Sequence, residues 1–380
     1  MIGYVEKRID MKSLMIVSNN VLRDARVQRE GKSIANAGHQ VRVIGWDRKG
    51  EASKEQQING IQVTRIRNSF LMKIAPSDLF RNPMWWRLAY KEGLKREFDL
   101  VHCHDLDTLQ SGVKLKKKRN TPLVFDAHEI FSYMIEEDVS RIVRNYAERM
   151  ERSLLRDVDH IITVNEALQR YYRERFGGDV SVVMNCPEEV LPEYEPPSTE
   201  EFTILYIGTL HKSRFVRELV DVISSMEGVQ LKIGGEKELY GEIEKKSQKA
   251  DNIHFLGTVP LKEVIPHTRQ SNVIFCMFDP ASRINQVGSP NKIFEAMAMG
   301  RPTIVTKGIL SGEIIEKEKC GLAVEYSEES LRNAIEQLRD DSSLCEELGK
   351  NGLKAAQNEY NWKAQEEKLL RLMSKIQESI

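Results

Sequence analysis

The sequence has none of the patterns expected of a membrane-spanning or disulfide-bonded protein. No hydrophobic run is long enough to cross a bilayer, and no signal peptide is visible. Its 5 cysteines are scattered, without the spacing of a zinc site or a disulfide framework. Such an odd, unclustered number is typical of reduced thiols in a protein core. We therefore expect a soluble, cytoplasmic protein.

Net charge and a glycine-rich loop are also missing. The 56 lysines and arginines are balanced by 57 aspartates and glutamates, which argues against a nucleic-acid binder held by bulk electrostatics. A dinucleotide-binding domain would place a G-x-G-x-x-G motif directly after its first strand. The stretch 19–26 fills that place and contains no glycine, which weighs against an NAD-dependent enzyme. Arg23 and Arg26 in this stretch are candidates for contact with an anionic group, or for pairing with Asp24.

What the sequence does contain is a repeated alternation of strands and helices. Its 380 residues, 41% hydrophobic and 30% charged, suffice for two or three domains with sizeable cores. The alternation stops in the stretch 186–201, which holds four prolines and six glutamates, and then restarts. Because this composition is typical of an inter-domain linker, we expect two α/β domains that share one plan.

The hydrophobic pattern predicts the individual elements of both halves. Strands are predicted over residues 14–18, 41–46, 61–66, 100–104, 123–126, 161–164 and 180–184, and then over 203–207, 229–233, 253–256, 273–278, 303–305 and 322–324. The main helices are predicted over residues 25–37, 69–98, 138–157, 167–176, 328–339, 344–360 and 362–376.

Polar side chains gather at two predicted strand ends of the first half. His102, His104 and Asp105 come at the end of one strand, and His128 and Glu129 follow the next. Ligands of parallel sheets gather beyond the carboxyl ends of strands, so these side chains could share one rim. Two histidines and acids could hold a metal, but alternate strand residues share one face and are often simply packed, so we expect no metal site. His128 is either a structural histidine or a polar group that faces a sugar.

The stretch 288–300 (GSPNKIFEAMAMG) is the most informative part of the chain. Ser289 and Pro290 are typical of an N-cap and a first helical residue. Lys292 lies in the first turn, where the helix dipole favours an acid, so the lysine and the free backbone N–H groups together suit a phosphate. Glu295 lies three residues on, on the same side of the helix, and suits a hydroxyl group. This pair would fit a sugar nucleotide; the alternative is a Lys–Glu pair on a solvated helix face.

A second strand-to-helix loop, residues 208–214, carries Lys212 and Arg214. Cationic side chains beside a helix start make it another candidate phosphate site. The strand that follows ends in Gly234 and Gly235, where the backbone can approach a ligand closely.

Residues 69–98 combine aromatic and basic side chains in an unusual way. A basic, tryptophan-bearing amphipathic segment can lie on a membrane surface, although we favour a helix packed against its own domain. The basic run Lys114–Arg119 could contact anionic lipid, or could be the exposed end of a helix. Peripheral contact with the inner face of a membrane is therefore a further expectation.

Taken together, these stretches resemble glycosyltransferase family 4, a large family of retaining, nucleotide-sugar-dependent enzymes with the GT-B fold. The most specific segment is 294–304, which is similar to the family signature E-A-M-A-x-G-x-P-V-I. The other similar segments are 207–214, 125–129, 23–30 with 38–41, and 361–362. The resemblance covers nearly the whole chain.

The resemblance implies an α/β architecture of two Rossmann-like α/β/α domains, whose parallel sheets face each other across a cleft. Residues 1–187 would form the N-terminal acceptor domain, 188–201 the linker and 202–361 the C-terminal donor domain. The last helix, 362–380, would cross back to pack on the N-terminal domain.

The resemblance also implies roles for individual residues. Glu295 would hold the ribose of the donor, and His128 would face the transferred sugar as the catalytic residue. The donor diphosphate would be held by the loop after the first strand of the second domain and by the start of the later helix. The residues concerned are Gly208, Thr209, Lys212, Arg214, Ser289, Asn291 and Lys292. The acceptor would contact Asn19, Asn20 and Arg26.

Three departures from the family pattern are visible. Val287 stands eight residues before Glu295, where the family often carries a second glutamate. Thr209 replaces the usual arginine of the diphosphate loop, and Arg214 the usual lysine, so Lys212 or Lys292 would supply the missing charge. The glycine-rich loop after the first strand is absent.

The expected reaction transfers a hexosyl group from a nucleoside diphosphate sugar, such as a UDP- or GDP-sugar, with retention at the anomeric carbon. The acceptor would be a hydroxyl of a glycan, a lipid-linked sugar or a small molecule, as in polysaccharide biosynthesis. Electrostatic stabilisation of the leaving diphosphate would be the main task, without a metal, a cofactor or an enzymic nucleophile. The alternatives are a catalytically weak sugar-nucleotide-binding subunit, a phosphorylase or epimerase, and a sugar transport protein.

Overall fold

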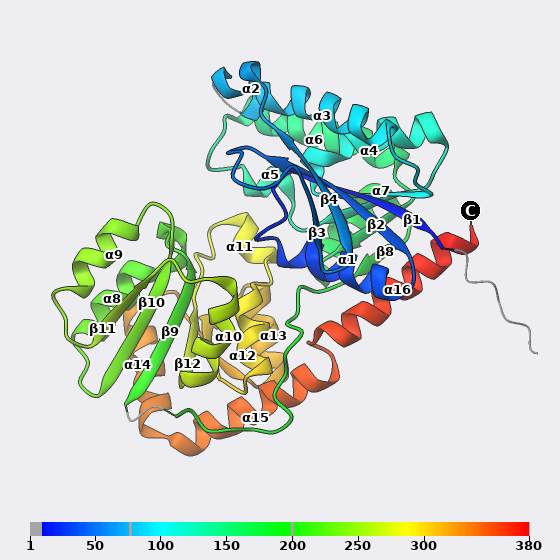
Figure 1. Cartoon of the computed structure of the whole chain (residues 1–380). Helices are drawn as coiled ribbons and strands as arrows, with labels where there is room; N and C mark the ends of the chain where they lie inside the picture. The colour runs from blue at the N-terminus through cyan, green and yellow to red at the C-terminus, as the bar shows by residue number, and fades with distance from the viewer. Residues whose placement is uncertain (1–9, 76–77, 199–200, 380) are drawn as a thin grey trace, which may run out of the picture. The chain divides into compact units, whose positions relative to one another are not determined.

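The computed structural model describes residues 10–75, 78–198 and 201–379 (Figure 1). It divides into two compact units. One contains the chain as far as Val183 together with Glu366 onward, and the other runs from Met184 to Gln365. We call them the N-terminal and C-terminal domains.

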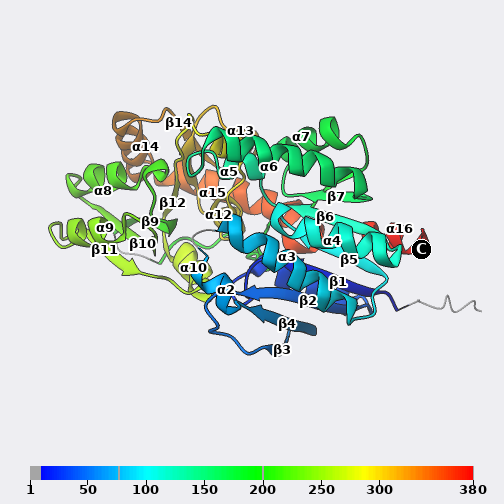
Figure 2. The ribbon, with the colours of Figure 1, turned by 90° about the horizontal axis from the view of Figure 1, so that it is seen from above.

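The N-terminal domain is built on an eight-stranded sheet with the order β3-β4-β2-β1-β5-β6-β7-β8 (Figure 2). The strands are β1 (Lys12–Val17), β2 (Gln40–Asp47), β3 (Glu55–Ile58), β4 (Ile61–Arg67), β5 (Leu100–His104), β6 (Leu123–Ala127), β7 (His160–Thr163) and β8 (Val180–Val182). All neighbours pair in parallel except β3, which pairs antiparallel with β4 at the edge. The predicted strands are confirmed, but β3 was not predicted.

Helices cover both faces of this sheet. The helices are α1 (Ala25–Asn36), α2 (Phe70–Ile74), α3 (Asp78–Leu94), α4 (Leu106–Arg119), α5 (Phe131–Met134), α6 (Arg141–Leu154), η1 (Leu155–Asp157), α7 (Glu166–Phe176) and most of α16 (Trp362–Glu378). Figure 1 shows α3, α4 and α6 on one side of the sheet, and α1 and α16 on the other. The long helix predicted over 69–98 is wrong as a single element, because the chain forms α2 and α3 there.

The central strands β1, β5 and β6 of this sheet are almost entirely buried. All side chains of β5 and β6 are buried, as are all but the first of β1. The strand order changes direction between β1 and β5, which are neighbours although three strands separate them in the chain. Ligands of doubly wound sheets bind at such a switch point, outside the carboxyl ends of the strands.

The C-terminal domain repeats the plan with a six-stranded parallel sheet in the order β11-β10-β9-β12-β13-β14. The strands are β9 (Phe202–Thr209), β10 (Val229–Glu236), β11 (Ile253–Gly257), β12 (Val273–Cys276), β13 (Thr303–Thr306) and β14 (Gly321–Val324). All six strands were predicted. The switch point of this sheet lies between β9 and β12.

The helices of the C-terminal domain are η2 (Lys212–Arg214), α8 (Val216–Ser224), α9 (Tyr240–Ser247), α10 (Leu261–Gln270), α11 (Arg283–Val287), α12 (Asn291–Ala298), α13 (Leu310–Glu318), α14 (Glu328–Asp340) and α15 (Ser342–Asn358). The short helix α11 was not predicted. Helix α12 begins one residue later than predicted. Pro290 is its N-cap and makes no side-chain cap bond, so the N-cap role expected for Ser289 is wrong.

Among the described residues, none of the helices combines the length and the low polarity that a membrane span requires.

Candidate functional site

An arginine is buried in the N-terminal domain, where it contacts Asp126 of β6 and the backbone of Val183. Arg26 is only 4% exposed and donates two hydrogen bonds to Asp126, from Nε at 2.8 Å and from Nη2 at 2.7 Å. Its Nη1 donates to the carbonyl of Val183 at 2.8 Å, and its Nη2 also pairs with Glu30 at 2.9 Å. Helix α1 brings Arg26 and Glu30 to β6 one turn apart. Burial alone would lower the pKa of Arg26, but the two carboxylates outweigh it and raise the pKa.

His128 lies between two carboxylates at the same edge of the sheet. Its Nε2 is 2.8 Å from Asp126, and its Nδ1 is 3.2 Å from Asp105. Its backbone N–H also donates to Asp105 at 3.2 Å. Burial lowers the pKa of His128, but Asp105 and Asp126 together raise it well above 6.5. His128 is therefore an imidazolium at neutral pH, with both ring N–H groups donated to acids.

Asp105 holds this position at the cost of backbone strain. Its φ is +61°, in a region that residues other than glycine seldom occupy and that costs on the order of 1–3 kcal/mol. Its side chain is 40% exposed, whereas Asp126 is fully buried. Strain at a strand end is typical of functional sites, since the surrounding structure must enforce it. The structure therefore places Asp105, which the sequence predicted at this rim, as its partly exposed carboxylate.

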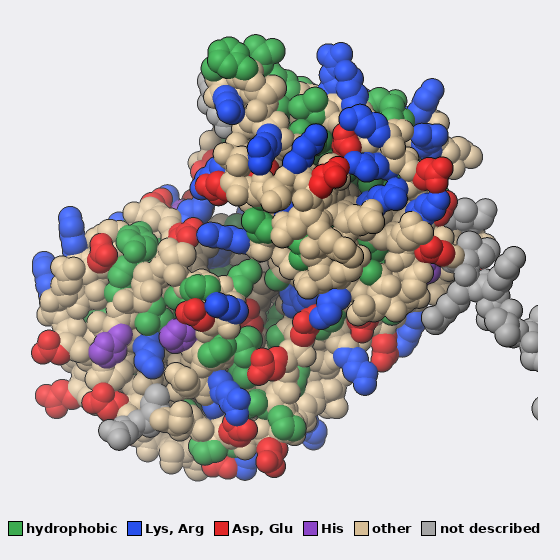
Figure 3. All heavy atoms as spheres, in the orientation of Figure 1, with side chains coloured by type: hydrophobic (Ala, Val, Ile, Leu, Met, Phe, Trp, Pro, Cys, Tyr) green, Lys and Arg blue, Asp and Glu red, His purple; other side chains and the backbone are tan. Residues whose placement is uncertain are grey.

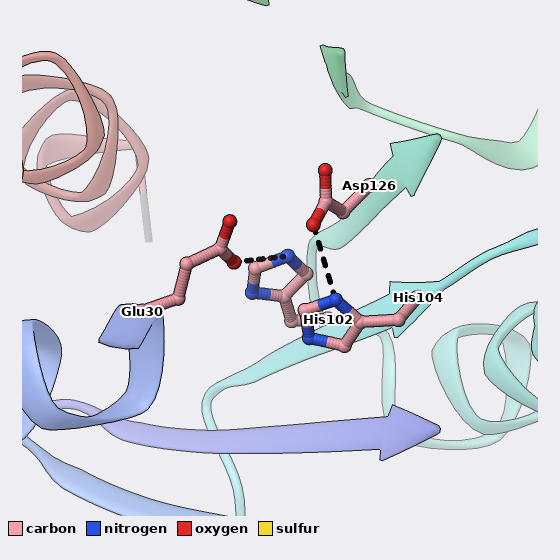
Figure 4. Close-up of side chains that lie close together, drawn as sticks. All are labelled: Glu30, His102, His104 and Asp126. Atoms are coloured by element: carbon pink, nitrogen blue, oxygen red, sulfur yellow. Dashed lines mark hydrogen bonds and ion pairs between the residues drawn. The ribbon is translucent and has the colours of Figure 1, made fainter. Parts of the chain in front are cut away.

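Four side chains nearby come close to the spacing of a metal site: Glu30, His102, His104 and Asp126 (Figure 4). The rings of His102 and His104 stack, however, with centroids 4.5 Å apart and planes 24° apart. Imidazole lone pairs lie in the ring plane, so those of two nearly parallel rings do not converge on one ion. Asp126 already accepts hydrogen bonds from Arg26 and pairs with His104 at 3.1 Å. This geometry favours a packed polar core over a metal centre.

Burial and neighbouring charges shift the pKa values of the titratable groups in this core in different directions. Burial raises the pKa of Glu30 to about 7, although Arg26 opposes the shift. Burial also raises the pKa of Asp126, but Arg26 and His128 outweigh it and hold the pKa well below 3.8. Burial lowers the pKa of His102 well below 6.5, so this histidine is neutral. Asp126 is thus the fixed anion around which Arg26 and His128 are arranged.

The predicted acceptor residues lie in and beside the loop after β1. Asn19 donates to Asp24 at 2.7 Å and accepts from the backbone of Val21, and Asn20 accepts from the backbone of Leu22 at 3.2 Å. These side chains shape the loop. Arg26 pairs with Asp126 rather than with Asp24, and its Nε, Nη1 and Nη2 all donate within the N-terminal domain. The acceptor role of the three residues stays a prediction, which the burial of Arg26 does not favour.

In the C-terminal domain the ammonium of Lys292 lies over the end of β9. Its Nζ is 4.9 Å from the centre of the Tyr206 ring, and a Cβ on Gly208 would come within 2.5 Å of it. Burial lowers the pKa of Lys292; Arg214 adds to this shift, while Cys276 and Glu295 oppose it. Lys292, Arg214 and Glu295 therefore interact electrostatically near the carboxyl ends of β9 and β12. An anion bound here would remove the electrostatic penalty on Lys292.

Arg214 is held in place from two sides. Its guanidinium lies 3.8 Å from the centre of the Phe278 ring, and its Nη1 donates to Asn285 at 2.9 Å. Asn285 belongs to α11, the short helix that the sequence did not reveal. Stacking and one hydrogen bond fix the plane of the guanidinium while leaving other N–H groups to bind a ligand.

Two glycines let the strand ends approach each other. Gly235 has a φ of +153°, and a Cβ on it would lie 1.7 Å from the carbonyl oxygen of Gly208. No side chain fits there. The contact brings the ends of β9 and β10 together beside the N-terminus of α12, where backbone N–H groups lack a side-chain cap. Such a helix end favours an anion.

The remaining predicted donor residues occupy different surroundings. Thr209 accepts a hydrogen bond from the Tyr206 hydroxyl at its backbone carbonyl, and Lys212 has an exposed side chain. Asn291, at the start of α12, accepts from Asn185 at 2.9 Å. Ser289 and Glu295 are both partly exposed. The roles of these five residues stay predictions.

Comparison with known families identifies both halves of the chain. The model of "Glycosyltransferase Family 4" matches residues 26–186, and that of "Glycosyl transferases group 1" matches residues 201–341. Together they cover most of the chain, one in each domain.

Similar proteins point the same way. Spore coat protein SA of Bacillus subtilis is 24% identical over 74% of this chain and 79% of its own. The capsular polysaccharide biosynthesis glycosyltransferase CapM of Staphylococcus aureus is 25% identical over 44% of this chain and 45% of its own.

Solved structures show the same fold. Sucrose-phosphate synthase of Thermosynechococcus elongatus has a TM-score of 0.80 at 18% identity, and covers 97% of this chain and 100% of its own. Anabaena HepE in complex with UDP-glucose has a TM-score of 0.70 at 17% identity, over 96% of this chain and 100% of its own. The two matched family models, the strand order of both sheets and these structures agree: this chain belongs to glycosyltransferase family 4 and is a transferase with the GT-B fold.

Proposed function

We propose that this transferase moves a hexosyl group from a nucleoside diphosphate sugar to an acceptor hydroxyl, with retention at the anomeric carbon. The observation that carries the proposal is the meeting of Lys292, Arg214 and the uncapped start of α12 at the switch point of the C-terminal sheet. Two cations and the backbone N–H groups at a helix start suit a diphosphate, and HepE, which shares the fold, was solved with UDP-glucose.

The donor diphosphate would serve as a counter-anion of Lys292. Burial and Arg214 make the free ammonium costly, so binding a diphosphate here restores the favourable charged state. Lys292 and Arg214 would then stabilise the negative charge that develops on the leaving phosphate. Glu295, on the same helix as Lys292, would accept hydrogen bonds from the ribose hydroxyls.

The reaction needs no enzymic nucleophile in this proposal. The bond between the anomeric carbon and the phosphate oxygen breaks, and a bond to the acceptor oxygen forms on the same face of the sugar. The acceptor's proton passes to an oxygen of the leaving diphosphate. The protein supplies positioning and electrostatic stabilisation, without a metal ion.

The contribution of the N-terminal domain would come through Asp105 as well as His128. Both ring nitrogens of His128 are engaged by carboxylates, so neither is free for a sugar hydroxyl. The carboxylate of Asp105 is the exposed member of this group, and His128 fixes its orientation. We therefore assign hydroxyl recognition to Asp105, and the orienting positive charge to His128.

The test is turnover of a panel of UDP- and GDP-sugars by the purified chain, with NMR assignment of the anomeric configuration of the product. The proposal predicts a product with the configuration of the donor, and activity that survives a chelator. Inversion at the anomeric carbon would contradict it. Nucleotide binding without turnover of any donor or acceptor would favour a binding subunit instead. Val287 and Thr209, which stand where the family often carries a glutamate and an arginine, are consistent with that alternative.

We also propose a peripheral contact between helix α2 and a membrane. Phe70, Leu71 and Ile74 are 76%, 62% and 62% exposed, and Lys73 lies among them. Three large apolar side chains on one exposed turn are unusual for a surface that faces only water. Replacing Phe70 and Leu71 by serine should reduce cosedimentation with anionic vesicles; unchanged cosedimentation would refute this contact.

A further inference from the structure

The short helix α11 contributes a buried amide to the surroundings of Arg214. Asn285 is only 3% exposed, and its Oδ1 accepts the hydrogen bond that Arg214 donates from Nη1 at 2.9 Å. Its Nδ2 donates to the carbonyl of Asp279 at 3.0 Å, and its backbone N–H donates to the carbonyl of Ser282 at 3.0 Å. Because both ends of the amide are bonded, its orientation is fixed, and Asn285 can hold the guanidinium in one direction.

The segment that precedes α11 is itself fixed to the sheet. The backbone N–H of Phe278 donates to the hydroxyl of Thr306 at 2.9 Å, and this hydroxyl donates to the carbonyl of Phe278 at 2.8 Å. Thr306 is the last residue of β13. The N–H of Asp279 donates to the carbonyl of Ser213, in the loop that carries the arginine, at 2.9 Å. The support of the arginine is therefore anchored both to β13 and to that loop.

The backbone next to Arg214 is strained. Phe215 has a φ of +53°, in the left-handed region that residues other than glycine seldom occupy. Its ring is 5% exposed and packs against Tyr326, with ring centroids 4.4 Å apart. Strain of this kind persists only where the surrounding structure enforces it, which is common at ligand sites. The packing of Phe215 thus adds a third constraint on the position of the arginine.

The bond from Asn285 leaves the charge of Arg214 uncompensated. Within the described ranges of the chain, Arg214 forms no ion pair and makes one hydrogen bond, the one to Asn285. Other arginines of this domain pair with acids, as Arg217 does with Glu242 at 2.6 Å, and Figure 3 shows acidic side chains interspersed among its lysines and arginines. Burial lowers the pKa of Lys292, and the charge of Arg214 adds to this shift. The positive charge is therefore felt at the site proposed for the diphosphate.

An aspartate at position 285 would hold the guanidinium more firmly than the amide does. Aspartate and asparagine have nearly the same shape, and a charge-assisted bond is roughly twice as strong as a neutral one. The carboxylate would, however, neutralise the arginine. A neutral amide in this place is therefore useful only where the charge of the arginine serves a further anion.

We propose that Asn285 is a positioning residue for the donor diphosphate: it orients Arg214 through an uncharged hydrogen bond and keeps the charge of the guanidinium for the phosphate oxygens. The inference rests on the proposed function, in which Arg214 contacts the diphosphate. It goes beyond that function because it requires an amide at position 285, and not simply any hydrogen-bonding group. The Nε and Nη2 of Arg214 then supply the two parallel N–H groups that a phosphate accepts.

The test compares two substitutions of the same side chain. Asn285→Asp keeps the shape and adds a carboxylate, whereas Asn285→Leu keeps the approximate volume and removes the hydrogen bond. Asn333→Asp, at an exposed position of α14 in the same domain, is the control for an added negative charge. Phosphorus NMR titration with UDP, GDP, ADP and inorganic pyrophosphate measures the dissociation constants, at a temperature where circular dichroism shows each variant to be folded.

For each probe that the wild type binds, we expect Asn285→Asp to bind at least about tenfold more weakly, and Asn285→Leu about threefold more weakly. Asn333→Asp should bind like the wild type. A merely structural role predicts the opposite order, because aspartate holds Arg214 and leucine does not. In an Arg214→Gln background neither substitution of Asn285 should weaken binding further, since its effect passes through the arginine.

The inference is overturned if either substitution of Asn285 binds the probes as tightly as the wild type, or if leucine weakens binding more than aspartate. Losses that persist in the Arg214→Gln background would overturn it as well. Should one of the two variants fail to fold, the other decides by its own affinity and by the same background. A wild type that binds none of the four probes would refute the proposed function, and the inference with it. Unchanged affinities of the variants would refute the role of Asn285 alone.

Discussion

Asp105 shows how one residue can link strain, charge and function. It occupies a left-handed backbone conformation at the end of β5, and it accepts hydrogen bonds from both the backbone and the ring of His128. Its position after a buried strand was visible in the sequence. Its strained backbone could not be predicted, because no local sequence pattern indicates a positive φ at an aspartate.

The first prediction concerns the charge of His128. Asp105→Asn replaces one of two anions that raise the pKa of His128, so this pKa should fall toward its ordinary value. NMR titration of the His128 imidazole measures it directly. Asp107→Asn, two residues along the chain, is the control and should leave the pKa of His128 unchanged. An unchanged titration in Asp105→Asn would show that the ion pair does not hold the charge.

The same shift determines a stability effect with a definite sign. The folded-state pKa of His128 lies above the unfolded value, so the charged ring stabilises the fold fully below about pH 6.5. This contribution is lost as the pH rises through the folded-state pKa. The wild-type thermal midpoint should therefore exceed that of Asp105→Asn by a margin that shrinks toward alkaline pH. A margin that grows with pH would contradict the assignment.

The partners of Arg26 show where residue-level prediction fails. The sequence placed Arg26 near an anionic ligand or near Asp24, but the fold pairs it with Asp126, 100 residues away. Only the parallel order β1-β5-β6 brings helix α1 and the end of β6 together. In contrast, the closeness of Lys292 and Glu295 follows from helical spacing within one turn, and the sequence was sufficient for it.

At the scale of elements, long apolar strands and capped helices were predictable, and short polar elements were not. β3 reads Glu-Gln-Gln-Ile, which has no apolar alternation, and it forms because β4 offers a free edge. α11 has five residues and no capping side chain, yet it carries the Asn285 that holds Arg214. Helix α12 was expected, and only its first residue was misplaced.

The close approach of β9 and β10 yields a prediction at this scale. Gly235→Ala would place a Cβ 1.7 Å from the carbonyl oxygen of Gly208, at a φ of +153°. We expect a loss of about 2 kcal/mol or more in the free energy of unfolding, from overlap and backbone strain. Urea denaturation measures it.

The matched control is Gly241→Ala in α9, where no atom lies within 4 Å of the added Cβ. It should be neutral or stabilising by up to about 1 kcal/mol, since alanine favours a helix over glycine. Equal effects of the two substitutions would mean that the strand ends of the C-terminal sheet are not tightly held.

At the scale of the whole molecule, two doubly wound sheets each place a polar site at their switch point. The division into two α/β halves was predictable from the alternation of elements and the proline-rich stretch that interrupts it. The family followed from the segment around Glu295, and the family models confirm it.

The central claim is that Lys292 and its surroundings hold the diphosphate of a nucleotide sugar. A thermal-shift panel of UDP, GDP, ADP and CMP tests it most directly, with wild type, Lys292→Ala, and Lys262→Ala as an exposed-lysine control from α10 of the same domain. At a hundred times its dissociation constant, a bound nucleotide should stabilise the fold by roughly 2.7 kcal/mol. We predict a rise in melting temperature with one nucleoside diphosphate that Lys262→Ala keeps and Lys292→Ala loses. An equal rise in both variants, or none with any nucleotide in the wild type, would contradict the claim.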